Sequence, residues 1–397
     1  MFRFALIALA SLLPCAAAGQ DAAAPLGIFE SQNDIGNVVH PGSGEYDAAA
    51  KSYLLYGSGV NMWLASDEFH FVWKKVSAQD LTLAANISIL GSSSEGHRKA
   101  VLMIRQSLDG DSAYVDAARH GDGLTSLQYR DKQGAVTHEI EANVSAPARL
   151  RIEKQGDRFY LWIASENEDL QFAGGSVRVE IHAPFYVGIG VCAHQKDAVE
   201  RAMFTDVDLS TSVTHPQAQY STIETVLLSG DARSGYVSRK HLAAPGWSPD
   251  GHVLTFQLDG QRQETPFTPL KTAAPVGAPV TDQPESKLVY FASSQNGSMQ
   301  IWRKAADGSQ PEQMTSDDFN NESPRLSPDG KLLLFLSYSK DLKALPENAE
   351  VELRVIGLAD KSIKTLARFT GGRDSLGTQP WSPDGRRVTF ISYQSME

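Results

Sequence analysis

One short phrase recurs along the second half of the chain, as "GWSPDGHVLTF" at 246–256, "RLSPDGKLLLF" at 325–335 and "PWSPDGRRVTF" at 380–390. Proline presets φ for the second position of a type I turn, Asp tolerates the next position, and Gly supplies the positive φ that returns the chain. The apolar run after each corner is typical of a strand that is covered on both faces. We therefore predict that these corners are structural turns, formed by Pro249, Asp250, Gly251, Pro328, Asp329, Gly330, Pro383, Asp384 and Gly385.

The spacing of the phrase predicts a β-propeller. A fourth copy, "PESKLVYFASS" from Pro284, keeps the strand although its turn has decayed. From Ser248 through Glu285 and Ser327 to Ser382, the copies lie about 40 to 55 residues apart, which is the range of propeller blades. We expect about four blades over residues 213–397. The stretch 262–284 contains five prolines and cannot supply inner strands, so the propeller is small or incomplete and its open edge needs a cover.

These repeats carry a family resemblance. The stretch "MQIWRKAADGSQPEQMTSDDFNNESPRLSPDGKLLLFLSYS" resembles the C-terminal propeller of the periplasmic translocation protein TolB and its WD40-like relatives. The resemblance covers about 180 residues, and it implies a protein that binds other proteins. It carries over no partner-binding residue, because the repeated residues build turns. TolB-type propellers have six blades, whereas four repeats fit this sequence.

The first half of the chain predicts a β-sandwich. Between Leu26 and Leu209 lie about twelve short β-type runs with turn residues between them and no long helical period. Two stretches, "RKAVLMIRQSLDGDSAYVDAARHGDGLTSLQYRD" and "FHFVWKKVSAQDLTLAANI", resemble the concanavalin-like jelly rolls found beside bacterial glycoside hydrolases. In some of those families the domain binds or cleaves carbohydrate. The expected fold class is all-β, with a jelly-roll sandwich over residues 20–212 followed by the TolB-like propeller.

Alternation along three of these runs suggests a ligand-binding face. Side chains two residues apart on a strand point the same way, so polar and aromatic residues of "MIRQS", "YVDAARH" and "SLQYR" share one side. If the three sides coincide, they form a polar, aromatic platform of the kind that orients a sugar. The alternative is cross-strand charge pairing on a solvated face. The candidate ligand-binding residues are Arg105, Tyr114, Asp116, His120 and Arg130.

The N-terminus predicts export. Arg3 precedes an apolar run from Phe4 to Leu13, and Ala16-Ala17-Ala18 supplies a small-residue cleavage site, so residues 1–19 are expected to be a bacterial Sec-type signal peptide. The run is too short to span a bilayer, which requires about twenty apolar residues, so no transmembrane segment is expected after cleavage. We expect a periplasmic or secreted protein. A lipoprotein anchored at Cys15 is less favoured, because Pro14 departs from a lipobox.

The sequence favours binding over catalysis. It contains no Gly-x-Ser-x-Gly elbow, and "HEIEA" at His138 lacks the second His of a zinc protease. After signal cleavage one cysteine, Cys192, is left in an apolar run, so we expect a core residue, and we expect neither a metal nor a cofactor. A formal net charge of −11 disfavours nucleic acid as a partner.

We therefore expect an exported, non-enzymatic binding or scaffolding protein without catalytic residues, whose partner is a protein, a glycan or both. The alternative is a carbohydrate-binding or glycoside hydrolase-like protein that acts through the jelly roll. A glycosidase needs two carboxyl groups across a cleft. The sequence candidates for that pair are Asp109, Asp111, Asp116 and Asp122.

Overall fold

The computed structural model of the chain describes residues 26–213, 218–267, 288–308, 311–342 and 344–396. These residues form thirty strands and one short 3-10 turn, Arg373–Ser375, and contain no α-helix. The all-β fold class predicted from the sequence is confirmed. The predicted signal peptide, the start of the fourth repeat and most of the proline-rich stretch lie outside the described residues. Within the described part of the chain, no helix has the length and hydrophobicity needed to cross a membrane.

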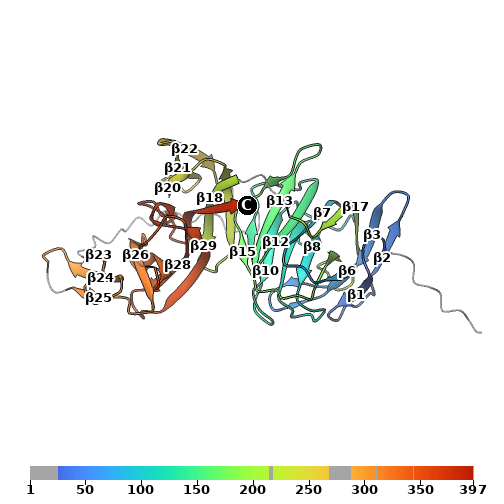
Figure 1. The fold of residues 1–397 in the computed structure, drawn as a ribbon, viewed down its shortest axis with the longest axis horizontal. Helices are drawn as coiled ribbons and strands as arrows, with labels where there is room; N and C mark the ends of the chain where they lie inside the picture. Colours follow the sequence, from blue (N-terminus) through green and yellow to red (C-terminus); the bar gives the residue numbers. More distant parts are fainter. Residues whose placement is uncertain (1–25, 214–217, 268–287, 309–310, 343, 397) are drawn as a thin grey trace, which may run out of the picture.

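Two large sheets pack face to face in the N-terminal half, as Figure 1 shows in blue and green. Apolar side chains alternate along their strands, and the inward ones fill the space between the sheets, for example Leu83 and Leu102. The inner strands of the first sheet are β6 (Phe69–Val76), β16 (Phe185–Cys192), β8 (Lys99–Arg105), β9 (Tyr114–His120), β10 (Thr125–Arg130) and β11 (His138–Glu141), with β1 (Ser31–Ile35) at the edge. The second sheet contains β2 (Ser43–Asp47), β3 (Ser52–Gly57), β7 (Leu81–Ile89), β12 (Arg149–Gln155), β13 (Arg158–Ala164), β14 (Gln171–Phe172), β15 (Val177–Arg178) and β17 (Glu200–Ser210).

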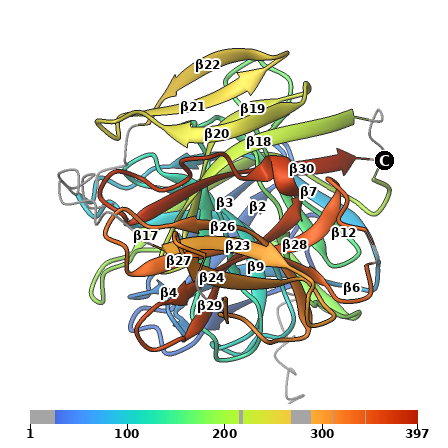
Figure 2. The same cartoon turned by 90° about the vertical axis from the view of Figure 1, so that its left-hand side faces the viewer.

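Four small groups of antiparallel strands, here called the blades, follow in the C-terminal half, and Figure 2 shows the molecule with these groups facing the viewer. One group contains β20 (Leu242–Trp247), β21 (Val253–Leu258) and β22 (Gln261–Pro266). A second contains β23 (Leu288–Ser293), β24 (Gln300–Ala305) and β25 (Glu312–Gln313). A third contains β26 (Phe319–Leu326), β27 (Leu332–Ser339), β28 (Ala349–Gly357) and β29 (Ile363–Gly371). The fourth joins the two ends of the region, because β30 (Arg387–Met396) pairs with β18 (Ala218–Leu227), which pairs with β19 (Ala232–Ser238).

The first two recurrent corners connect β20 to β21 and β26 to β27, and the third precedes β30, where Trp381 and Val388 form an isolated bridge. Gly251, Gly330 and Gly385 have φ of +74°, +69° and +68°, in the region that favours glycine. In the last corner the amide of Arg386 donates to Asp384 Oδ1 at 3.1 Å, and the Ser382 hydroxyl donates to the same oxygen at 2.6 Å. The first two corners repeat this pattern. The aspartates are therefore used inside the turns.

The first sheet of the sandwich continues into the C-terminal half. Strand β11 pairs in parallel with β19, with Ile140 opposite Ala232 and Glu141 opposite Arg233. One hydrophobic core cluster runs through both halves, from Leu102 between the sandwich sheets to Leu336 and Phe390 in the blades. Strand pairing and core packing therefore join the blades to the sandwich.

Candidate functional site

The five residues predicted as a ligand-binding face do lie on one side of the first sheet, on β8, β9 and β10. Register places Arg105 opposite Tyr114, and Tyr114 opposite Arg130. Their side chains are not an open platform, because Arg105, Tyr114, Asp116 and Arg130 are 0% exposed and His120 is 3% exposed. The open platform and the alternative, a solvated face with charge pairs, both require exposed side chains, whereas these five side chains are buried.

A short hairpin buries these side chains. Strands β4 (Met62–Trp63) and β5 (Ser66–Asp67) fold over the outer side of β8, β9 and β10. Both carboxylate oxygens of Asp67 accept from the Arg130 guanidinium, at 2.7 and 2.9 Å, and Arg105 lies 3.6 Å away. The Tyr114 hydroxyl donates to the Met62 carbonyl oxygen at 3.3 Å. Three of the five predicted residues, Arg105, Tyr114 and Arg130, thus contact this hairpin and hold it over the sheet.

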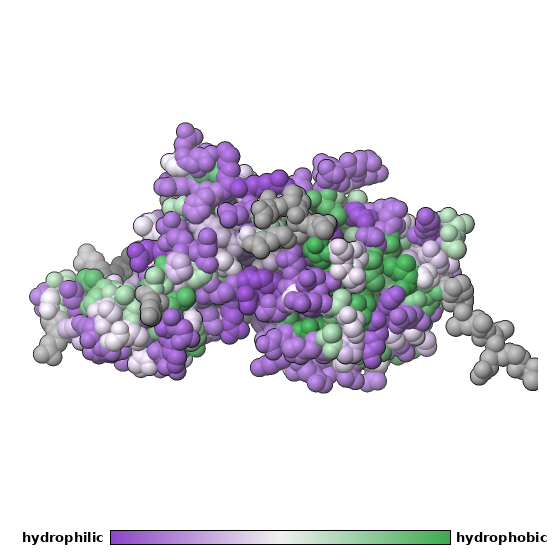
Figure 3. Space-filling view, viewed as in Figure 1, coloured by the Kyte–Doolittle hydropathy of each residue, from purple (hydrophilic) through white to green (hydrophobic). Residues whose placement is uncertain are grey.

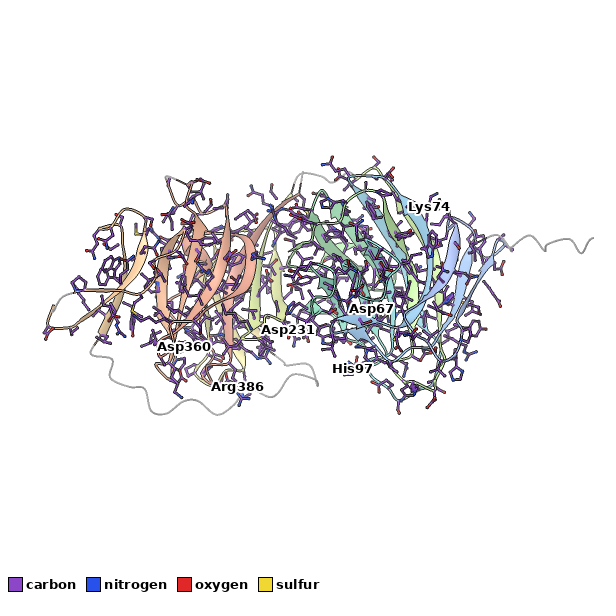
Figure 4. All side chains as sticks on the ribbon, turned by 90° about the horizontal axis from the view of Figure 1, so that it is seen from below. Asp67, Lys74, His97, Asp231, Asp360 and Arg386 are labelled. Atoms are coloured by element: carbon purple, nitrogen blue, oxygen red, sulfur yellow. The ribbon has the colours of Figure 1, made fainter. Side chains whose placement is uncertain are left out.

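Beside this cover the same sheet face is hollow, with a cavity of about 560 Å³. Its floor comes from β8 to β11, and its walls come from the hairpin, from the loops before β8 and after β16, and from the tip between β18 and β19. Figure 4 shows two of its lining residues, His97 on the sandwich and Asp231 at the junction with the blades. The cavity is lined by Val60, Asn61, Trp63, Leu64, His97, Lys99, His120, Leu124, Gln128, Glu139, Glu141, His194, Leu227 and Asp231.

An ordered chain of hydrogen bonds crosses the cavity floor. The buried Lys99 ammonium donates to Gln128 Oε1 at 3.1 Å and lies over the Trp63 ring, 5.9 Å from its centre. With its oxygen fixed in this way, Gln128 donates through Nε2 to Glu139 Oε2 at 3.2 Å. The floor therefore contains an ammonium, an amide and a carboxyl group in a set order, in which Lys99 and Gln128 are buried and Glu139 is half-buried.

Three imidazoles form one end of the cavity. His120 Nδ1 lies 3.1 Å from the Leu124 carbonyl oxygen and must donate to it, so Nε2 is the acceptor, and Gln128 Nε2 lies 3.4 Å from it. The His97 ring centre lies 6.2 Å from that of His120 and 5.8 Å from that of His194. Burial lowers the pKa of His120 well below its usual value, and burial together with the Lys99 charge lowers the pKa of His194 to about 3. Both rings are neutral at physiological pH.

Two carboxyl groups stand on the floor toward the junction. Glu139 and Glu141 are two residues apart on β11, so both side chains lie on the cavity side. Burial raises the pKa of Glu139, although the Gln128 hydrogen bond opposes it. Burial, and then the Glu139 charge, raises the pKa of Glu141 to about 7, against the Arg233 and Arg387 charges. Glu141 therefore changes charge near neutral pH.

Only part of this site is predicted by the sequence pattern. His120 was predicted and lines the cavity, whereas Arg105, Tyr114, Asp116 and Arg130 do not. The candidate carboxylates Asp109, Asp111 and Asp122 also lie outside the cavity lining, and each accepts a local hydrogen bond. The alternation that led to His120 also contains Lys99 on β8 and Glu139 and Glu141 on β11. Trp63 lies on β4, a strand of two residues, and His97 and His194 lie in loops, so none of the three belongs to a stretch with such a period.

No three His, Cys, Asp or Glu side chains in the described part of the chain are grouped so as to hold a metal ion. The expected core residue Cys192 is buried on β16, and its thiol lies 3.3 Å from the Glu68 carbonyl oxygen. Burial raises the pKa of this thiol to about 12, so it stays protonated.

Comparisons with known proteins add a relative without a known function. No family model matches the chain. An uncharacterized protein of Agrobacterium fabrum (strain C58), Atu1656, is 30% identical over 161 residues, which are 38% of this chain and 55% of that protein. The chain thus spans about half the length of this curated relative.

Solved structures of low similarity include a candidate TolB from Agrobacterium tumefaciens, at 18% identity and a TM-score of 0.28, over 81% of this chain and 100% of that one. A family 7 alginate lyase in complex with substrate has 10% identity and a TM-score of 0.30, over 43% of this chain and 83% of that one. TM-scores this low carry no argument about function.

Proposed function

We propose that the protein is an exported binding protein whose sandwich cavity holds a carbohydrate. The observation that carries the proposal is the cavity lining, in which the Trp63 ring stands beside an ordered row formed by Lys99, Gln128 and Glu139. Sugars offer apolar ring faces and many hydroxyl groups that both donate and accept. A concave site with one aromatic face and a few fixed polar groups matches that chemistry.

A screen of soluble oligosaccharides against the chain without residues 1–19, followed by titration calorimetry, tests this proposal. Trp63→Ala removes the aromatic wall and is expected to weaken binding by roughly tenfold or more, since a buried aromatic contact commonly dominates an interface. Trp73→Ala is the matched control, because Trp73 is a half-buried tryptophan on β6 outside the cavity. Equal losses in both variants, or no oligosaccharide bound, would contradict the proposal.

One observation favours hydrolysis as a second candidate function. Glu139 and Glu141 lie on one side of β11, and Cα atoms two residues apart on a strand are separated by about 6.6 Å. Both carboxyl groups can therefore reach one ligand over the floor, and glycoside hydrolysis uses two carboxyl groups, one as acid and one as base or nucleophile. With a pKa of about 7, Glu141 is suited to protonate a leaving group, while Glu139 would act as base or nucleophile. Glu141→Gln should then abolish sugar release and leave binding intact, as measured by reducing-sugar assay and calorimetry.

We also propose that the protein is exported and that its C-terminal propeller binds a partner protein. The N-terminal pattern of Arg3, the apolar run and the alanine triplet supports cleavage near Gly19. Edge strand β22 is mostly exposed, and an exposed edge offers backbone groups to a partner chain. N-terminal sequencing of the protein recovered from the cell envelope or medium, and a pull-down with the same material, test these two points. An intact Met1 or a lipid on Cys15 would contradict the cleavage.

A further inference from the structure

The cavity has a wall where its floor reaches β19, the strand that continues the first sheet into the C-terminal half. The floor runs from Lys99 on β8 to Glu139 and Glu141 on β11, and the next strand in the same sheet is β19 of the blade. The tip between β18 and β19 stands there, and its residues Leu227 and Asp231 line the cavity. A chain lying across the strands from β8 to β11 would therefore run into this tip.

The tip is fixed by its own hydrogen bonds and by both of its neighbours. The Leu227 amide donates to the Asp231 carbonyl oxygen at 2.9 Å, and the Ser229 hydroxyl donates to Asp231 Oδ2 at 2.8 Å. His138 Nδ1 on the sandwich lies 3.2 Å from Asp231 Oδ1. The Lys364 ammonium on β29 donates to the Leu228 carbonyl oxygen at 2.6 Å. A wall held from three directions does not open easily for a ligand.

The hairpin of β4 and β5 closes a second side. It is anchored through the fully buried pair of Asp67 and Arg130, and the Arg130 guanidinium also donates to the Leu64 carbonyl oxygen at 3.1 Å. The Thr137 amide donates to the same oxygen at 2.9 Å. The hairpin is therefore attached to the sheet and to the loop before β11 by the buried ion pair and by these hydrogen bonds.

We propose that the cavity binds the end of a glycan chain and excludes internal segments of a long chain. This inference rests on the proposed carbohydrate binding. An internal segment needs two open exits from its site, one for each direction of the chain. Here the floor ends against Leu227 and Asp231 in one direction, so the terminal sugar lies against the carboxyl groups of Glu139 and Glu141. The rest of the chain leaves past His97, the exposed residue of the imidazole end.

Binding stoichiometry tests the proposal. The chain without residues 1–19 is titrated with β-1,4-linked oligomers of mannuronate, glucose and N-acetylglucosamine, each of four and of eight units, and with the alginate polymer. End binding predicts about one protein per chain at every length, with unchanged affinity per chain. Binding of internal segments predicts that the number of proteins per chain rises with chain length, and this result would overturn the inference while leaving carbohydrate binding standing. No binding to any probe would overturn both.

A variant with shorter side chains at the tip between β18 and β19 provides a second test. Leu227→Ala with Asp231→Ala shortens the tip side chains, and the number of proteins per alginate chain should rise from about one to several. Leu228→Ala is the control, because Leu228 is the next residue and does not line the cavity. Far-UV circular dichroism and the melting temperature show that both variants are folded. Polymer stoichiometry that stays the same in the folded double variant would also overturn the inference.

Discussion

Arg130 shows how a residue chosen as a ligand contact can instead support the structure. It reaches Asp67 with two hydrogen bonds, and both side chains are 0% exposed. Arg130→Ala leaves the Asp67 carboxylate buried, with Arg105 at 3.6 Å as its remaining ion-pair partner among the described residues, and removing one partner of a buried ion pair costs about 3–5 kcal/mol. We expect urea denaturation to show a loss of that size.

Lys240→Ala is the control for this change, because Lys240 pairs with Asp259 on the open surface and should leave the urea midpoint unchanged. A midpoint for Arg130→Ala equal to that of the parent chain would show that the cover over β8, β9 and β10 does not depend on this pair.

Glu224 makes folding depend on pH. Its side chain is buried on β18, where the Ser392 hydroxyl donates to it, and burial raises its pKa to about 7. Between the ordinary pKa near 4.5 and about 7, the folded state holds a proton that the unfolded state has released. Stability therefore falls as pH rises through this window, by about 3 kcal/mol in total.

Glu224→Gln keeps a neutral side chain at every pH, so it should flatten this part of the stability curve and stabilise the chain above pH 7. Urea titrations at pH 4.5, 6 and 8 measure the slope. His120 and His194, whose lowered pKa values act in the opposite direction, are present in both proteins and cancel in the comparison. Equal slopes in the two proteins would refute the assignment.

Single-residue alternation predicted which side chains share a sheet face, and the structure places Arg105, Tyr114 and Arg130 together as that period requires. It could not predict their burial. The cover comes from β4 and β5, two strands of two residues each, which have no detectable period. Local pattern thus gives the direction of a side chain, while exposure depends on segments that are distant in sequence.

Among the connecting elements, the loop after β14 approaches β18 and β19 closely at Gly174. Gly174 has φ of +93°, and a Cβ there would lie 2.6 Å from Ser234 Oγ and 2.8 Å from Thr222 Cγ2. Gly156 also has a positive φ, +57°, but has nothing within 4 Å. Gly174→Ala therefore adds a collision with β18 and β19 to the backbone strain, whereas Gly156→Ala adds strain alone.

We expect Gly174→Ala to lower the melting temperature by several degrees more than Gly156→Ala, since each 1 kcal/mol shifts the midpoint of a large domain by about 2–4 °C. Differential scanning fluorimetry compares the two variants directly. Equal shifts would mean that the loop does not need its close approach to the blade.

The repeated corners allowed strand positions in the C-terminal half to be predicted from sequence, because proline, aspartate and glycine specify a turn locally. Two pairings had no such signal. Strand β30 joins β18 through residue pairs that lie 160 to 178 positions apart in the sequence, and β11 joins β19 through two residue pairs. Both depend on how the chain closes in space, which no local phrase encodes.

Across the whole chain, the change of sequence texture near residue 213 marks no break in the packing. Figure 1 shows the blades beside the sandwich, and the hydrophobic core cluster includes side chains from both. Polar contacts add to it, since Arg178 Nε on β15 lies 3.3 Å from Glu350 Oε2 on β28, and Asn143 donates to the Gly235 carbonyl oxygen at 2.7 Å. Figure 3 shows the same junction as mainly hydrophilic on its outer surface.

A shared core predicts shared unfolding. We expect scanning calorimetry of the chain without residues 1–19 to show one transition, with equal calorimetric and van't Hoff enthalpies. Ile140→Ala should weaken the junction, because Ile140 is buried where β11 meets β19 and a Cβ on Gly175 would already lie 3.0 Å from it. A cavity there costs about 2–5 kcal/mol and is expected to split the transition in two, with the blades melting first because their groups have three or four strands. Two transitions in the parent chain would show instead that the halves fold independently and that the continuous sheet carries no cooperativity.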